Sequence, residues 1–166
     1  MSENYIVING KRAELTKEQL KQLGIVVKKE TPFDRQRKRK PFYYIINKGT
    51  VEYGEELEDY QCDALYDAAN YCTDKAIMEQ RALHETLNRL LWRYSMEHEG
   101  DKIDWTHTNQ AKWEILYNHR GKYFEFCNWQ TSQAVGTVFF ATKQIAELAV
   151  KEIIEPFMEA HPEFKW

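Results

Sequence analysis

The chain has no run of apolar residues long enough to cross a membrane, and its N-terminus lacks the basic and then apolar start of a signal peptide. It also has few cysteines. Only three occur among its 166 residues, and they share no close spacing. An odd number of scattered cysteines is typical of reduced thiols and argues against a disulfide framework. We therefore expect a cytoplasmic protein that has no membrane partner.

Recognisable catalytic motifs are missing as well. The seven glycines form no phosphate-binding loop, since Gly49, Gly54, Gly121 and Gly136 stand singly at expected turns. The five histidines share no metal-ligand spacing, and none of them neighbours a cysteine. Cys127 is a candidate nucleophile, but a lone cysteine in a strand is usually a small core residue. The sequence therefore predicts a protein that is not an enzyme, with no catalytic residue, no metal site and no cofactor.

What the chain does contain is a large share of aromatic residues, with 5 Trp, 10 Tyr and 8 Phe. Aromatic side chains bury large areas in cores and on sheet faces, and their polar atoms also suit them to interfaces. We expect most of them to pack in a core. A chain of this length can bury one compact body or two small ones.

The charge of the chain is unevenly distributed. The formal net charge is −3, yet residues 28–40 hold seven basic side chains against two acidic ones, a net of +5. The remainder therefore carries −8. The basic run could neutralise phosphates of a nucleic acid. The alternative, which the acidic remainder of the chain favours, is a solvated linker whose charges attract the acidic surface of the same protein.

An internal repeat is the most informative feature of the sequence. In the first part of the chain, a strand pattern is followed by a turn at Asn47, a further strand and a helix start at Thr73. The same order recurs later, with the turn at Asn118 and the helix start at Thr142. The offsets are 71 residues for the asparagines and 69 for the threonines. A repeat at a nearly fixed offset indicates that one supersecondary unit is used twice.

Each copy is expected to contain three strands and one helix. In the first copy, the strands lie near residues 42–46, 51–53 and 68–72, and Thr73 caps a helix that ends at Gly100. One apolar stripe of that helix contains Ala76, Gln80, Leu83, Leu87, Leu90, Leu91 and Tyr94. In the second copy, the strands lie near 113–117, 122–127 and 137–141. Thr142 caps a helix that Pro156 kinks or ends.

The N-terminal residues predict a small separate element. Asn9 and Gly10 form a strong hairpin signal between two short strands. Thr16 and Gln19 then form a capping box, and Gly24 stands where a left-handed residue ends the short helix.

The expected fold is therefore α+β, with antiparallel sheets. A β-hairpin and short helix occupy residues 1–27, and a basic linker follows at 28–41. Two tandem β-β-β-α units occupy residues 42–100 and 113–166, joined by a connector at 101–112.

Four segments together resemble small, largely uncharacterised accessory proteins of phages and prophages of Gram-positive bacteria: INGK with LTKEQLKQLGI, YYIINKGTV, NYCT and VFFATKQIAELAVKEII. The resemblance covers nearly the whole chain. It implies a protein that acts in the cytoplasm of a bacterial host. Such proteins often bind host machinery, and anti-CRISPR and other anti-defence inhibitors are among them.

The second copy is also similar to the three-strand-plus-helix arm-binding domains of phage integrases. That resemblance implies DNA contacts from Lys112, Trp113, Arg120, Lys122 and Tyr123. Glu114 and Glu125 interrupt these strands, and the first copy has acidic residues where a basic face would be needed.

The leading hypothesis is a non-enzymatic phage or prophage protein that binds a host protein or host defence complex. Its expected contact residues are Glu55, Glu56, Glu58, Asp59, Trp105 and Trp129. A variant is a sponge for a nucleotide signal, with Arg81, Arg89, Arg93 and Arg120 as its candidate residues. Aromatic edge strands also make a homodimer an option.

The alternative is a nucleic-acid-binding module that uses the basic linker and the second sheet. Its residues would be Arg35, Arg37, Lys38, Arg39, Lys40, Lys112, Trp113, Arg120, Lys122 and Tyr123. A structural component of a virion is a third class, which the sequence neither supports nor excludes.

Overall fold

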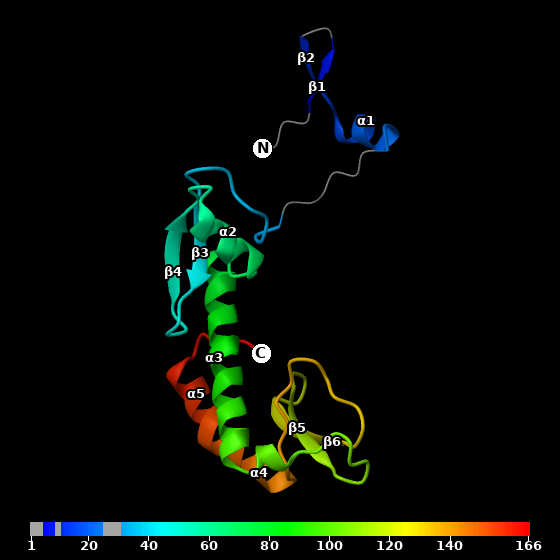
Figure 1. Ribbon diagram of the computed structural model, residues 1–166, viewed down its shortest axis with the longest axis vertical. Helices are drawn as coiled ribbons and strands as arrows, with labels where there is room; N and C mark the ends of the chain where they lie inside the picture. Colours follow the sequence, from blue (N-terminus) through cyan, green and yellow to red (C-terminus); the bar gives the residue numbers. More distant parts are fainter. Residues whose placement is uncertain (1–4, 9–10, 25–30) are drawn as a thin grey trace. The chain divides into compact units, whose positions relative to one another are not determined.

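A computed structural model of the chain describes residues 5–8, 11–24 and 31–166 and has mixed α and β structure (Figure 1). The chain divides into two compact units, Met1–Asp34 and Arg35–Trp166. Residues 35–41, which the sequence assigns to the basic linker, thus belong to the second unit.

The first unit contains a hairpin and one short helix. β1 (Tyr5–Ile8) pairs antiparallel with β2 (Lys11–Glu14), and α1 (Lys17–Gln22) follows. The capping box is confirmed, because Thr16 Oγ1 accepts from the Gln19 amide and Gln19 Oε1 accepts from the Thr16 amide. Gly24 has a φ of +70°, as expected for a left-handed helix end. The predicted turn residues Asn9 and Gly10 lie outside the described residues.

In the second unit, a hairpin lies between two helices. β3 (Pro41–Ile45) pairs antiparallel with β4 (Val51–Glu55), and Gly49 in the turn has a φ of +78°. Successive side chains of a strand point to opposite faces. Phe42 packs toward α2 (Tyr60–Asp67), whereas Ile45 packs toward α3 (Lys75–Glu97).

The prediction of a strand near residues 68–72 was wrong. The residues just before it form α2, whose N-cap Asp59 accepts from the Cys62 amide at 2.9 Å. Only one bridge, between Tyr43 and Cys72, remains of the third strand. The amide group of Asn70 takes the place of strand backbone, because it accepts from Ile45 N and donates to Ile45 O, both at 2.8 Å.

The long helix α3 begins one residue later than expected. Its N-cap is Asp74, which accepts from the Ile77 amide, and not Thr73. The helix ends at Glu97, before the 3-10 turn η1 (Gly100–Lys102). The residues of α3 that are buried are Met78, Ala82, Leu87, Tyr94 and Ser95. Of the predicted stripe, only Leu87 and Tyr94 are fully buried, because the helix packs against different neighbours along its length.

The second hairpin lies against the C-terminal half of α3. β5 (Lys112–Asn118) pairs antiparallel with β6 (Tyr123–Trp129). The third strand predicted at 137–141 was also wrong, because a single bridge between Trp113 and Phe140 stands in its place. Both predicted third strands are thus reduced to one bridge, at a corresponding position of each predicted copy.

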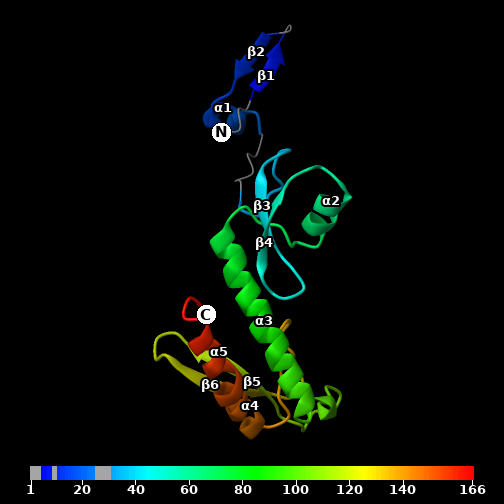
Figure 2. The same ribbon diagram turned by 90° about the vertical axis from the view of Figure 1, so that its left-hand side faces the viewer.

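The C-terminal helical segment runs beside α3 in both views (Figures 1 and 2). It consists of α4 (Lys143–Ala149), the π-helical turn η2 (Val150–Ile154) and α5 (Glu155–Ala160). Thr142 caps α4 as predicted. Pro156 does not end the helix, because the α-helical pattern changes to the π-helical turn η2 just before it and resumes with Pro156 in the first turn of α5.

Three clusters of buried side chains lie along α3, and the middle one contains Leu87, Val150, Ile154 and Phe157. The N-terminal core contains Ile45, Cys72, Met78 and Ala82, whereas Tyr94, Phe140, Ala146 and Ala149 are central to the C-terminal core. The helix of the first predicted copy therefore also packs against the second copy.

Candidate partner-binding groove

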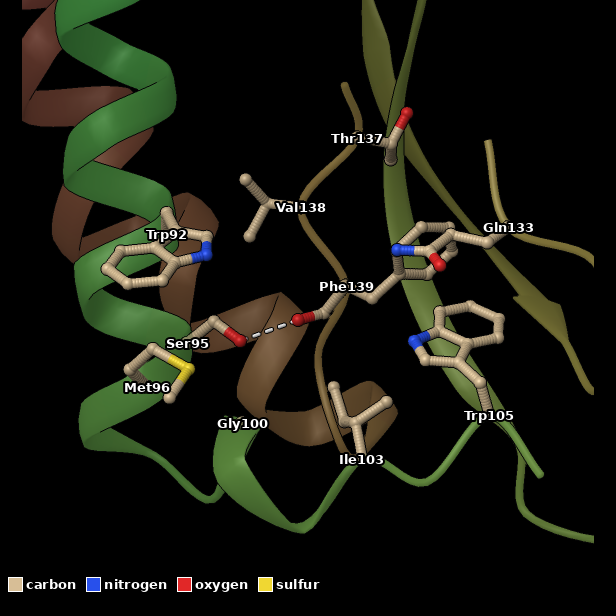
Figure 3. A pocket seen from close by; sticks show the side chains of 10 residues that line it. All are labelled: Trp92, Ser95, Met96, Gly100, Ile103, Trp105, Gln133, Thr137, Val138 and Phe139. Carbon is tan, nitrogen blue, oxygen red and sulfur yellow. Dashed lines mark hydrogen bonds between the residues drawn. The ribbon is translucent and has the colours of Figure 1, made fainter. Parts of the chain in front are cut away.

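A small hollow opens at the C-terminal end of α3, with a volume of about 160 Å³ (Figure 3). Three parts of the chain form it: the last turns of α3, the segment from η1 to β5, and the loop from β6 to α4. We call this hollow the groove. Its lining residues are Trp92, Ser95, Met96, Gly100, Ile103, Trp105, Gln133, Thr137, Val138 and Phe139.

The α3 side of the groove is apolar and accessible. Trp92 is 60% exposed and Met96 is 42% exposed, although both are large apolar side chains. They are four residues apart and thus neighbours on one face of the helix. The loop opposite supplies Val138 and also carries Val135, whose side chain is fully exposed.

The floor of the groove is held by a close approach between α3 and the loop. Ser95 Oγ donates to the carbonyl of Phe139 at 2.5 Å, and both residues are buried. Gly100 passes directly beneath, so that a Cβ atom at this position would lie 2.6 Å from Ser95 O. Only glycine fits there without a shift of the helix end.

The far wall is built around Lys112. Trp105 meets Phe139 edge to face, with ring centroids 4.8 Å apart. Lys112 Nζ lies 5.3 Å from the Trp105 ring centroid and donates to the carbonyls of His107 and Gln130 at 2.8 and 2.7 Å. The fully buried ammonium thus ties the loop before β5 to the loop after β6.

The size of the groove suits a single side chain better than a small molecule. None of the described residues that line the groove is charged, and its volume is below the about 300–1,000 Å³ typical of ligand pockets. One rim is acidic, because residues 97–104 hold four carboxylates, of which only Glu97 and Glu99 have a basic partner among the described residues, Arg93 and Lys102 respectively. Asp104 is on this rim, and hydrogen bonds from Thr106 hold the pKa of its carboxyl below the usual range.

Of the residues predicted to contact a partner protein, only Trp105 lies in the groove. Trp129 is on the other face of the β5–β6 hairpin from the core, where its Nε1 donates to Glu114 Oε1 at 2.5 Å. Trp129 nevertheless remains 43% exposed.

Most of the four carboxylates that were expected to contact a partner are engaged within the protein. Glu56 is fully buried and pairs with Arg35, whose Nη2 lies 3.0 Å from Glu56 Oε1. Asp59 caps α2, and Glu58 lies 3.6 Å from Lys38 Nζ. Glu55 is exposed at the end of β4. A partner surface made of all four carboxylates is therefore wrong for Glu56, because its carboxylate is covered by its own chain.

The contacts among Glu56, Arg35 and Tyr71 also shift pKa values. The Arg35 guanidinium holds the pKa of the Glu56 carboxyl below its usual range, and Arg35 also lies 2.6 Å from Asp63. Tyr71 donates to Glu56 Oε2 at 3.1 Å, and burial raises the pKa of Tyr71 to about 12. These contacts anchor the start of the second unit to the β3–β4 hairpin.

The structure divides the residues predicted to bind nucleic acid. Lys112 is buried, and Trp113 packs in the C-terminal core, so neither belongs to a basic platform. Arg35 is ion-paired. The exposed members of the set are Arg37, Lys38, Arg39, Lys40, Arg120, Lys122 and Tyr123.

Sequence reasoning missed most of the groove. Trp92 and Met96 stand outside the predicted stripe of α3, and their spacing of four residues is the signal that could have found them. Ile103, Val138 and Phe139 come from segments without a regular pattern, so that only the fold brings them to the same place.

Among the described residues, no group of three or more His, Cys, Asp or Glu side chains is arranged to hold a metal ion. None of the helices in the described part of the chain is both long and apolar enough to span a membrane. Comparisons of the chain with models of protein families, with curated proteins and with solved structures give no match.

Proposed function

We propose that this chain is a non-enzymatic binding protein that docks on a partner protein through the groove. The observation that carries the proposal is the exposure of Trp92 and Met96 beside a hollow that is large enough for one side chain. Aromatic residues and Met are enriched in protein interfaces, and Trp is over-represented among the residues that dominate binding energy.

The expected anchor is a large apolar side chain of the partner. It would enter between Met96, Ile103 and Val138, while Trp92 covers it from the side. Because residues 97–104 make one rim acidic, basic residues beside the anchor would complement the groove.

We further propose that the partner is a host protein or defence complex, and that the chain is a phage or prophage accessory protein which inhibits it one to one. The support for this context is the sequence resemblance. The nucleotide-sponge variant has less support, because Arg81 pairs with Glu85 and Arg93 lies 3.9 Å from Glu97. In addition, the described residues that line the groove include no arginine.

Nucleic-acid binding remains the second proposal, and the exposed basic residues at 37–40 and at the β5–β6 turn favour it. Such binding would weaken steeply with salt, because it depends on phosphate neutralisation. A fluorescence titration with duplex and single-stranded DNA across salt concentrations tests it. Absence of binding at low salt would remove this proposal.

The test of the groove uses three forms of the full chain: wild type, Trp92→Ala and Tyr60→Ala. Tyr60 is 84% exposed on α2 and provides a matched loss of an exposed aromatic side chain. Each form is immobilised and exposed to lysate of a Gram-positive bacterium, and retained proteins are quantified by mass spectrometry. We expect one protein that wild type and Tyr60→Ala retain and that Trp92→Ala does not. Equal retention by all three forms would overturn the proposal.

A further inference from the structure

One edge of β6 faces away from β5. The residues whose backbone groups point to this edge can be derived from the bridge between β5 and Phe140, which lies on the other side of β5. Trp113 N donates to Phe140 O at 2.9 Å, and Phe140 N donates to Trp113 O at 2.7 Å. The backbone groups of Trp113 therefore point away from β6. Because these groups alternate in direction along a strand, those of Lys112 and Glu114 point toward β6.

The register of the hairpin extends this assignment to β6. Glu114 is opposite Cys127 and Leu116 is opposite Glu125, so these two β6 residues exchange hydrogen bonds with β5. The alternate residues, Phe124, Phe126 and Asn128, direct their N–H and C=O groups to the open edge. Within the described part of the chain, nothing outside the β5–β6 ladder bonds to these groups.

Proteins usually protect such an edge with Lys, Pro, a bulge or a very short strand. β6 has none of these, since its seven residues contain neither Lys nor Pro and its register with β5 is continuous. Its single charge is Glu125. By contrast, the edge of β4 is partly covered, because Cys62 Sγ donates to the carbonyl of Glu55.

The β6 edge is complementary to itself. In an antiparallel pair of two β6 strands, the two-fold register that overlaps all seven residues sets Phe126 opposite Phe126. It also sets Phe124 opposite Asn128, so that every residue facing the edge meets another that does. Tyr123 then lies opposite Trp129, an aromatic pair that stabilises sheets. Glu125 meets Cys127, so no like charges face each other.

We propose that this chain forms a two-fold dimer in which β6 pairs antiparallel with β6 of a second copy, centred on Phe126. The two hairpins then form one continuous four-stranded sheet. Tyr123 and Trp129, which are 52% and 43% exposed in the single chain, become partly covered across the new strand pair. The dimer uses a different surface from the groove and does not depend on the proposed function.

A cross-linking experiment tests the register. Residues opposite each other without hydrogen bonds have Cβ atoms about 4.5–5.5 Å apart, which is near the span of a disulfide. The variant Glu125→Cys would therefore place its new thiol opposite Cys127 of the other copy. Under mild oxidation, we expect a disulfide-linked dimer on a non-reducing gel. Mass spectrometry should then show a peptide pair in which the introduced thiol is joined to Cys127.

The matched control is Leu116→Cys, which places a thiol on the same face but on β5, where Leu116 is 41% exposed. We expect this variant to remain uncross-linked, because β5 is one strand away from the dimer axis. Equal cross-linking of the two variants, or none in Glu125→Cys, would overturn the proposed pairing.

A second measurement examines the edge itself in the full chain without added thiols. Asn128→Pro removes one edge-facing N–H and leaves the β5–β6 bonds intact, since Pro is tolerated where the N–H faces solvent. By light scattering after size exclusion, we expect twice the mass of one chain for wild type and Asn128→Ala. Asn128→Pro should elute as a monomer. A monomeric wild type, or a dimeric Asn128→Pro, would contradict the proposal.

Discussion

Lys112 Nζ lies 5.3 Å from the centroid of the Trp105 ring and carries no carboxylate partner within ion-pair distance among the described residues. A buried charge is normally compensated by an ion pair. Here two backbone carbonyls and an aromatic face take that role. The charge thus stabilises the wall of the groove and is not available to a ligand.

Replacing this ammonium should loosen the wall. Lys112→Met keeps the length of the side chain but leaves the carbonyls of His107 and Gln130 without their donor. Each buried unsatisfied group costs about 1–3 kcal/mol, and we expect the free energy of unfolding to fall by about 2 kcal/mol or more. Chemical denaturation measures it. Lys122→Met, at an exposed position of the same hairpin, should change stability by less than about 0.5 kcal/mol. An equal loss of stability in Lys112→Met and Lys122→Met would contradict the proposed structural role of the buried ammonium.

Glu56 should make the stability of the second unit depend on acid pH. Its folded-state pKa lies below the ordinary glutamate value of about 4.3, because Arg35 donates to the carboxylate. Its stabilisation is therefore complete above that value and is lost as the pH falls through the folded pKa.

Chemical denaturation of wild type and Glu56→Gln is measured across acid pH. The difference between their free energies of unfolding isolates the contribution of Glu56, because the other titrating groups are common to both proteins. We expect the wild type to be more stable at neutral pH and the difference to shrink as the pH falls below about 4. Glu55→Gln, at the exposed neighbour, should follow the wild type. A difference that stays constant with pH would be inconsistent with the Glu56–Arg35 pair.

Asn70 should protect one backbone amide from exchange with solvent. Its Oδ1 accepts from Ile45 N, and its Nδ2 donates to Ile45 O. In Asn70→Ala, the Ile45 amide loses its partner, and we expect faster hydrogen exchange there with little change at Tyr43, which bonds to Cys72. Asn70→Asp keeps an acceptor, so the Ile45 amide should stay better protected than in the alanine variant. Equal protection of the Ile45 amide in wild type and both variants would show that the Asn70 side chain does not replace the hydrogen bonds of a neighbouring strand.

Much of the fold could be predicted where its cause is local. The capping side chains of Thr16 and Thr142 act within three residues, and the turns at Asn47 and Asn118 depend on a few adjacent residues. The third strands failed for the opposite reason. Whether residues 68–72 form a strand depends on the distant β3 edge. The Asn70 side chain satisfies that edge at Ile45, and the backbone pairs with it only at the Tyr43–Cys72 bridge.

The groove and the surroundings of Glu56 were harder to predict, because the charge of a residue in the sequence does not show whether its side chain is buried. Lys112 appeared as a surface cation and Glu56 as part of an acidic surface, yet both are fully buried among polar partners from other segments. Trp105 was the one groove residue in the predicted set. Its partners Phe139 and Lys112 meet it only in the folded chain.

If the groove binds a partner protein through Trp92, as proposed, the affinity of the complex must depend on this side chain. The protein that wild type captures is purified and titrated by calorimetry with wild type, Trp92→Ala and Tyr60→Ala. We expect a one-to-one complex, an affinity loss of at least about 30-fold for Trp92→Ala, as for a residue worth about 2 kcal/mol or more, and no loss for Tyr60→Ala. Affinities that are equal for wild type and Trp92→Ala would contradict the proposal.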